Sequence, residues 1–182
     1  MNLKGLLSEK RTIILESWFD LIVQSYPPET SKFLKREKDR FDNPVAYEFR
    51  QGIEGIYEAL LHGMDRNKVL SFLDRIISIR AIQDLIASGA VAFIFLLKTA
   101  IRKQVEGEIR KEGIYEDLLD LESRIDGLAL MCFDIYAARR EKLYKIKENE
   151  AKNRVNGLLK MAGLIYEQSE ESSLKEEKPL TG

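Results

Sequence analysis

The sequence predicts an all-α protein: a single helical bundle of about five core helices with a long C-terminal helical extension. Three observations lead to this fold class. Apolar residues recur at the three- and four-residue spacing of amphipathic helices along most of the 182 residues. No segment of useful length alternates apolar and polar residues, as a half-buried strand would. Proline, glycine and asparagine stand at the points where such helices would begin or end.

The first predicted helix runs from Leu3 to Tyr26, and the pair Pro27-Pro28 ends it. Proline has no amide hydrogen to donate, and it restricts the residue before it to extended conformations. A short helical turn is expected within residues 30–38. The apolar positions that share one face of the first helix are Leu7, Ile14, Trp18, Leu21 and Ile22.

Asn43 and Pro44 mark the start of the second helix, because asparagine caps helix N-termini and proline fits the first turn. This helix is expected to end near Gly63. A third helix starts after Asp65 or Asn67, either of which can serve as its cap. The apolar faces of the two helices comprise Val45, Phe49, Ile53, Ile56 and Leu60 in the second and Val69, Leu70, Leu73, Ile76 and Ile77 in the third.

The most hydrophobic run of the chain spans residues 86–101 and belongs to the fourth predicted helix, which starts at Ser88-Gly89. The run is shorter than the roughly 20 residues that a membrane-spanning helix needs, and it contains Lys98. We therefore expect a buried helix at the centre of the bundle and no transmembrane segment.

The fifth predicted helix starts near Tyr115, after a helix stop at Gly113, and no clear stop signal follows its apolar stripe. We divide the chain into a helical bundle, residues 1–140, a charged amphipathic helical extension, residues 141–166, and a disordered acidic tail, residues 167–182. The tail is rich in Glu and Ser and has almost nothing to bury. The stripe inside the bundle comprises Leu118, Leu121, Ile125, Leu128, Met131, Cys132 and Ile135.

The extension contains apolar residues that step by four and three, the spacing of a coiled-coil seam. This spacing indicates a helix that binds a protein partner, pairs with a second copy in a homodimer, or folds back on its own bundle. The seam is short, and two of its members are alanines. The predicted partner-binding residues are Ala151, Val155, Leu158, Leu159, Ala162 and Ile165.

The charge balance gives the chain no general affinity for nucleic acid, since 29 basic side chains stand against 30 acidic ones. The basic clusters within residues 32–40 and 139–154 are interleaved with Glu and Asp, and they lack the spaced aromatic residues that stack on bases. A single cysteine excludes an internal disulfide and suits a reducing cytoplasm. No signal peptide is recognised at the N-terminus, so we expect a cytoplasmic protein.

Few side chains are available for catalysis or for holding a cofactor. The chain has one histidine, His62, and one cysteine, Cys132. His62 stands at a predicted helix C-terminus, where a cation complements the helix dipole, and Cys132 falls in an apolar stripe typical of a buried, unreactive thiol. Neither zinc-ligand clusters nor Glu-x-x-His pairs occur. We expect no enzyme, no metal and no cofactor; haem binding through His62 is a less favoured alternative.

Arg80, Gln83 and Asp84 form a polar cluster just before the predicted central helix. One interpretation is a capping and hydrogen-bonding junction, because buried polar groups need partners whether or not a ligand is present. The other is a ligand or switch site to which Trp18 and Tyr57 also contribute. The first interpretation is favoured, and the second stays open as a small-ligand-sensing function.

Three consecutive segments of the chain resemble a known family. The segments are SYPPETSKFLKREKDRFDNPV, GIEGIYEALLHGMD and LDRIISIRAIQDLIASGAVAFIFLLKTAI. The likeness runs from about Trp18 to Ile101, with a weaker helical continuation to about Tyr144. Together they resemble the N-terminal domain family of RsbRD-type RsbT co-antagonists. The Pro-Pro-Glu-Thr turn and the segment from IRA to AVAF carry most of the likeness.

The resemblance implies a helical sensory input module of stressosome-like signalling in bacteria, without catalytic residues. Such a domain normally precedes a STAS domain; here only the charged extension and tail follow, so we expect a stand-alone module. The leading hypothesis is a non-enzymatic signalling adaptor in the bacterial stress response that acts through protein–protein interaction. The alternatives are a small-ligand sensor and an accessory subunit whose extension docks on a membrane-associated complex.

Overall fold

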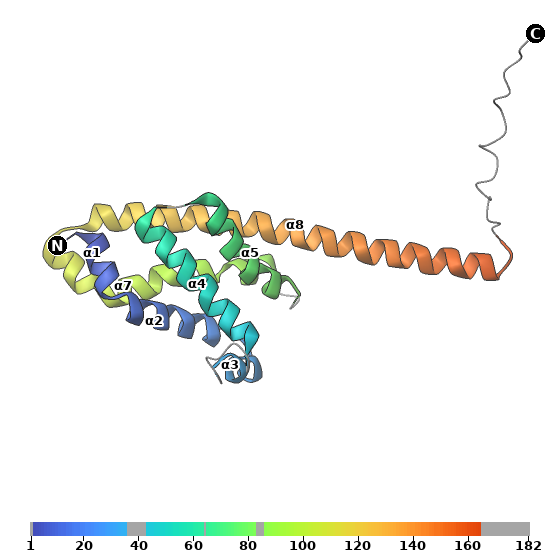
Figure 1. Ribbon diagram of the computed structural model, residues 1–182, viewed down its shortest axis with the longest axis horizontal. Coiled ribbons are helices and arrows are strands. Elements are labelled where there is room, and N and C mark those ends of the chain that lie inside the picture. Colours follow the sequence, from blue (N-terminus) through green and yellow to red (C-terminus); the bar gives the residue numbers. More distant parts are fainter. Residues whose placement is uncertain (1, 36–42, 64, 83–85, 165–182) are drawn as a thin grey trace, which may run out of the picture. The chain divides into compact units, whose positions relative to one another are not determined.

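A computed structural model describes residues 2–35, 43–63, 65–82 and 86–164, and within them the side chains of all residues except 79–82. These residues form eight helices and no strand, which confirms the all-α prediction (Figure 1). In chain order the helices are α1 (Leu3–Glu9), α2 (Arg11–Gln24), α3 (Pro28–Lys35), α4 (Pro44–His62), α5 (Arg66–Ile82), α6 (Ala87–Val91), α7 (Phe93–Glu112) and α8 (Tyr115–Met161).

Contacts between residues divide the chain into two units. The first, the bundle unit, spans Met1–Glu141 and contains α1 to α7 and the first part of α8. The second, the C-terminal unit, spans Lys142–Gly182, and its described residues, 142–164, comprise the rest of α8 and the turn that ends it. The predicted disordered tail, residues 167–182, lies outside the described residues.

The predicted start of the second helix is confirmed by its capping contacts. The Asn43 side chain accepts a hydrogen bond from the Ala46 amide at 3.0 Å, and Pro44 occupies the first turn of α4. The Asn43 amide group also donates to the Phe33 carbonyl of α3 at 2.6 Å. This buried side chain therefore begins α4 and joins it to α3.

Three further predicted boundaries are confirmed. Asp65 accepts the amide of Asn67 at 3.0 Å and so caps the start of α5. Gly63 and Gly113 follow the ends of α4 and α7 with φ values of 101° and 72°. Positive φ is accessible to glycine without strain, which is why glycine so often ends a helix.

The helix predicted from Leu3 to Tyr26 is interrupted. Lys10 separates α1 from α2, and α2 ends at Gln24. The break has a tertiary cause: α1 packs on both α4 and α7, and Lys10 Nζ donates to the Gln104 carbonyl of α7 at 2.5 Å. Contacts with residues far along the chain thus override a helical pattern that is locally continuous.

The predicted start of the central helix at Ser88-Gly89 is wrong by one residue. Ile86 is extended, the helix begins at Ala87, and it is divided at Ala92 into α6 and α7. The Ser88 carbonyl accepts the Ala92 amide at 2.9 Å, so Ser88 already lies inside the first turn. No side chain caps this helix start, which explains why local signals misplaced it.

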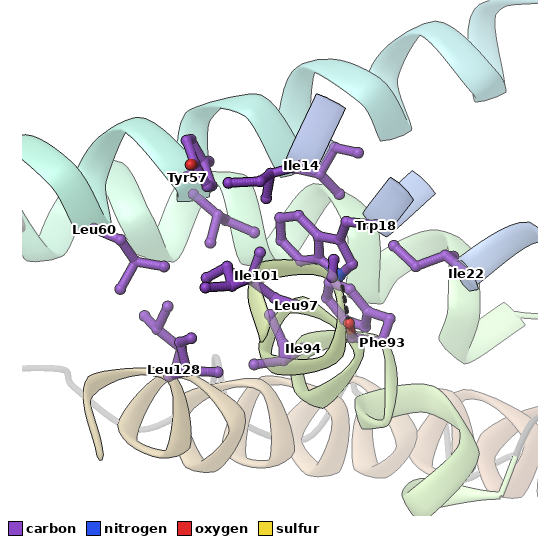
Figure 2. Packing of buried hydrophobic residues seen from close by; sticks show 14 of the residues in the cluster. Ile14, Trp18, Ile22, Tyr57, Leu60, Phe93, Ile94, Leu97, Ile101 and Leu128 are labelled. Atoms are coloured by element: carbon purple, nitrogen blue, oxygen red, sulfur yellow. Dashed lines mark hydrogen bonds between the residues drawn. The ribbon is translucent and has the colours of Figure 1, made fainter. Parts of the chain in front are cut away.

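Helix α7 lies in the buried core of the bundle unit. Trp18 of α2 donates its indole N–H to the Phe93 carbonyl at 2.7 Å, and the two stacked rings have centroids 6.4 Å apart. Figure 2 shows Leu97 and Ile101 of α7 between Trp18 on one side and Leu128 of α8 on the other. The prediction of a buried central helix is therefore confirmed. Within the described ranges, no helix combines the length and hydrophobicity that a membrane crossing requires.

Helices α4 and α5 approach one another closely at two glycines. A Cβ added to Gly52 would lie 2.8 Å from side-chain carbons of Ile76, which is fully buried. A Cβ added to Gly55 would lie 2.5 Å from the ring of Phe72. Both distances are below those of real Cβ contacts, so α5 can lie along α4 only because neither position has a side chain.

Replacing Gly52 by alanine is expected to lower the free energy of unfolding by about 1–3 kcal/mol, because Ile76 cannot move without disturbing the core. Gly107 and Gly127 are matched controls, since an added Cβ would meet nothing within 4 Å at either position. Alanine there should raise the free energy by about 0.5–1 kcal/mol through helix propensity. Urea denaturation measures both changes. A Gly52→Ala variant as stable as the controls would contradict the close approach.

Candidate functional site

The residues of the predicted ligand or switch junction lie in different parts of the chain. Trp18 and Tyr57 are core residues, 0% and 1% exposed, and Figure 2 shows both among the packed apolar side chains. Arg80 belongs to α5, but its side chain is not among those described, and Gln83 and Asp84 lie outside the described residues. A ligand or switch role for these five residues stays a prediction.

The hydroxyl group of Tyr57 has a protein partner. It donates to the Leu7 carbonyl at 2.9 Å. Leu7 lies in the last turn of α1, where carbonyls have no amide donor within the helix, so the bond satisfies an otherwise unpaired buried group. Burial raises the pKa of Tyr57 well above its ordinary value, and the negative charge of Glu58 adds to the shift. Tyr57 thus links α4 to α1 in its neutral form.

The single histidine and the single cysteine occupy the positions expected of them. His62 is the last residue of α4, and its exposed Nε2 lies 3.3 Å from Oε2 of Glu58. Cys132 is buried in α8, as predicted. Among the residues that the structure describes, no three His, Cys, Asp or Glu side chains gather in a way that could hold a metal ion.

Arg50 of α4 is a partly buried cation that sequence analysis missed. Its guanidinium lies 3.6 Å from the centre of the Phe19 ring, a cation–π contact between α4 and α2. Its buried Nε has no hydrogen-bond partner among the described atoms, and burial lowers the pKa of Arg50. Glu16 and Asp20 line the same small hollow, so it is a poor site for an anion. No local pattern could have found a contact between positions so far apart in the sequence.

Two ion pairs join α7 to α8 within the bundle unit. Arg102 binds Glu122 through two hydrogen bonds, Nε to Oε1 and Nη2 to Oε2, both 2.5 Å long. Glu122 is buried, and its hydrogen bonds raise the pKa of Arg102. Lys98 Nζ lies 2.6 Å from Oδ1 of Asp126. A bidentate pair requires a defined orientation of both side chains. The Arg102–Glu122 pair therefore restricts how α8 is rotated about its axis relative to α7.

Helix α8 also contacts α4 and α5. Arg124 Nη2 donates to the Leu60 carbonyl at 2.5 Å, near the end of α4. Arg139 Nε and Nη2 donate to the two carboxylate oxygens of Asp74 in α5, at 3.0 and 2.5 Å. The Arg139 and Asp74 side chains are each 41% exposed, so water screens this pair and it contributes little stability.

Burial of apolar residues changes along α8. In the bundle unit the helix buries a regular stripe: Leu118, Leu121, Ile125, Leu128, Ala129, Cys132 and Tyr136. In the C-terminal unit, six large apolar side chains are exposed: Tyr144, Ile146, Val155, Leu158, Met161 and Leu164. Val155 and Leu158 fall on one side of the helix, and apolar residues gathered on one exposed face can mark an interaction site.

The predicted partner-binding residues belong to this exposed part of the chain. Ile165 lies outside the described residues, and Leu159 is half-buried. The remaining four predicted residues are exposed: Ala151, Val155, Leu158 and Ala162. Their exposure is compatible with a docking role, but partner binding itself stays a prediction.

The bundle unit has an exposed apolar surface of its own, near the α7–α8 ion pairs. A hollow of about 410 Å³ lies between the two helices and is lined by Arg102, Glu106, Ile109, Tyr115, Leu118 and Leu119. Phe95 of α7 and Leu130 and Phe133 of α8 are also exposed. Sequence analysis missed this surface, although apolar residues outside the core stripe of the fifth predicted helix were a usable signal.

Replacing Tyr57 by phenylalanine is expected to lower the free energy of unfolding by about 1–3 kcal/mol, because the buried Leu7 carbonyl loses its donor. Tyr115→Phe is the matched control: Tyr115 is exposed, and the change should stay within about 0.5 kcal/mol. Urea denaturation at neutral pH measures both. An equal effect at the two positions would contradict a structural role for the Tyr57 hydroxyl.

The difference between wild type and Tyr57→Phe should shrink above about pH 10, where tyrosine ionises in the unfolded chain. Because the pKa of Tyr57 is raised in the folded state, its stabilising contribution is complete below the unfolded pKa and is lost as pH rises towards the folded one. The phenylalanine variant lacks this loss. Urea midpoints on both sides of pH 10 check the trend.

Comparison with known proteins finds a family whose model matches most of the chain. The family model described as the RsbT co-antagonist protein rsbRD N-terminal domain matches residues 13–151, which extend from α2 into α8. No curated protein and no solved structure gave a significant match. The family match covers most of the chain and includes the whole α4–α7 core. The chain therefore belongs to the RsbT co-antagonist rsbRD N-terminal domain family, whose members are stressosome-related signalling domains.

Proposed function

We propose that this chain is a non-enzymatic signalling adaptor of the stressosome type. In this proposal the bundle unit receives the input, and the exposed apolar part of α8 beyond Glu141 binds a protein partner. The change in burial along α8 carries the proposal: its apolar stripe is part of the core up to Tyr136, whereas six large apolar side chains after Glu141 are exposed. Such surface is costly to leave in water unless a partner covers it.

Family membership supports signalling through protein contacts. The family is described as a domain of an RsbT co-antagonist, a description that refers to action on another protein. A helical input module needs no reactive group for such a role. It needs two arrangements of its helices and a surface that a partner can distinguish between them.

The distribution of reactive side chains supports a role without catalysis. A nucleophile and its base act within hydrogen-bond reach of each other. The only histidine, His62, is exposed beside Glu58 at the end of α4, whereas the only cysteine, Cys132, is buried in α8. Neither has the setting of a catalytic group.

The contacts of α8 suggest how an input could reach the partner surface. Arg102 is 57% exposed but Glu122 is buried, so losing this pair would leave one buried carboxylate without compensation, which is costly. The half-exposed pair of Arg139 with Asp74 is worth only about 0.2–1 kcal/mol. A stimulus that rearranges α5 would therefore release α8 at Arg139 well before it disturbs the pair at Glu122.

Replacing Val155 and Leu158 together by asparagine tests the proposal, since it removes exposed apolar surface without changing the net charge or the core. Recovery of partners by affinity purification from the native host, under two growth conditions, should fall at least about tenfold, the equivalent of about 1.4 kcal/mol.

The matched control replaces Leu119 and Leu130, which are equally exposed but lie in the bundle unit. This variant, with asparagine at both positions, loses two exposed leucines where the test variant loses a valine and a leucine, and it should recover partners as wild type does. Circular dichroism confirms that both variants keep their helices. If the control lost its partners while the Val155/Leu158 variant kept them, the docking surface would lie on the bundle unit and the proposal would be wrong.

A further inference from the structure

We propose that the exposed face of α8 in the C-terminal unit binds an acidic amphipathic helix of a protein partner. The inference rests on the proposed function and names the chemical class of the protein partner in it. The surface concerned consists of four exposed residues, called here the α8 seam: Ala151, Val155, Leu158 and Ala162.

The α8 seam has the spacing and the exposure of one helix of a coiled coil that lacks its partner helix. Its members step by four, three and four, so they fall on one side of a helix. Val155 is 54% exposed and Leu158 is 57% exposed. Ala162 still belongs to the helical turn, because its amide donates to the Leu158 carbonyl at 2.9 Å. The two small alanines at the ends allow a second helix to approach closely.

The charged residues at the positions that flank the α8 seam are all basic, whereas Glu148 falls at the core position one step before Ala151. Residues 142–164 contain six basic side chains and only two acidic ones. One of the acids, Glu148, already lies 2.7 Å from Lys152. In a heptad reading, the positions that flank the seam are occupied by Lys145, Lys147, Lys152 and Arg154, followed by the apolar Leu159 and Met161. No acidic residue occupies a flanking position.

A second copy of the chain is a poor occupant for this surface. In a parallel pair, Lys147 of one helix would face Lys152 of the other, and in an antiparallel pair each basic flank would face itself. Like charges at these positions oppose pairing, whereas acidic flanks on a different helix make the same contacts attractive. The charge pattern therefore favours an acidic partner over self-association.

A membrane surface is also disfavoured, although the flanks are basic. Helices that lie in a membrane interface bury a broad apolar face, often with aromatic residues. The α8 seam is narrow: two of its four members are alanines, and none is aromatic. So narrow a stripe is better suited to knobs-into-holes packing against another helix than to insertion into a lipid surface.

The part of α8 that carries the seam has low intrinsic helix propensity, so packing against a partner would stabilise it. Four poor helix formers occur in this part of α8: Asn149, Asn153, Asn156 and Gly157. The helix nevertheless has a defined end, where Gly163 has φ 68° and the amides of Gly163 and Leu164 donate to the Lys160 and Leu159 carbonyls at 3.0 Å. A helix of weak propensity gains most of its stability from packing against another.

Two synthetic helical peptides of about three heptads test the inference on the full chain. Both have leucine and isoleucine at the seam positions; one has glutamate at every flanking position and the other has lysine. Repulsion between like flanks keeps each peptide from pairing with itself. With fluorescent peptides, anisotropy should report binding of the acidic probe and at least about tenfold weaker binding of the basic probe.

Reversing the flank charges gives the decisive variant. Lys152→Glu with Arg154→Glu should weaken binding of the acidic probe at least about tenfold and improve binding of the basic one. Lys142→Glu is the matched control, because at about 100° per residue Lys142 falls on the opposite side of the helix from the α8 seam. It should bind the acidic probe within about twofold of wild type, since its charge lies outside the contact.

Several results would overturn the inference. They are equal binding of the two probes, no binding of the acidic probe, or an unchanged affinity after the flank reversal. A second copy is the occupant if sedimentation equilibrium shows a dimer that Val155→Asn with Leu158→Asn abolishes. A membrane is the occupant if the chain floats with phosphatidylserine vesicles and the flank reversal prevents it. The chain's own tail is the occupant if removing residues 167–182 is required for probe binding.

The outcome can be separated from that of the proposed function. Partner recovery from the host depends on the apolar Val155 and Leu158, whatever the charge of the partner. If recovery falls with those residues but the acidic probe fails, the adaptor function stands and its partner is not an acidic helix. If the acidic probe binds as expected but recovery is unaffected, the surface is competent and the adaptor function fails.

Discussion

The structure of the bundle unit depends on the contact between Trp18 and the beginning of α7. The indole of Trp18 is fully buried, stacks on Phe93 and donates to its carbonyl at 2.7 Å, so one residue of α2 fixes both the position and the rotation of α7. Phe49 of α4 packs edge-on against the same Phe93 ring. A buried polar group must be paired, which leaves little freedom in how these three helices meet.

With α7 held in this way, α8 can be positioned by contacts of two strengths. Apolar packing and the pair of Arg102 with the buried Glu122 hold the part of the helix nearest its start, whereas the half-exposed pair of Arg139 with Asp74 holds it near the end of the bundle unit. In the proposed function, this difference in attachment along one helix would let a small input alter the weak contact and leave the fold intact.

Local sequence patterns anticipated the candidate site only in part. The spacing of Val155 and Leu158 pointed to a docking helix, because coiled-coil periodicity is readable along one segment. The exposed apolar residues Phe95 and Leu130 were missed, although Leu130 lies outside the core stripe of its helix and was a usable signal. Arg50 on Phe19 was missed because α4 and α2 meet there only after folding. Arg80, Gln83 and Asp84 keep their predicted role untested.

The sequence by itself determined the all-α class and most helix limits, since Asn43, Gly63, Asp65 and Gly113 act on backbone groups within a few residues of their own positions. The tertiary structure alone decided where locally continuous helices break and which of them touch. The break at Lys10 follows from contacts with α4 and α7. The close approach of α5 to α4 depends on Gly52, which has no side chain to separate the two helices. Such contacts join distant positions, and no local propensity records them.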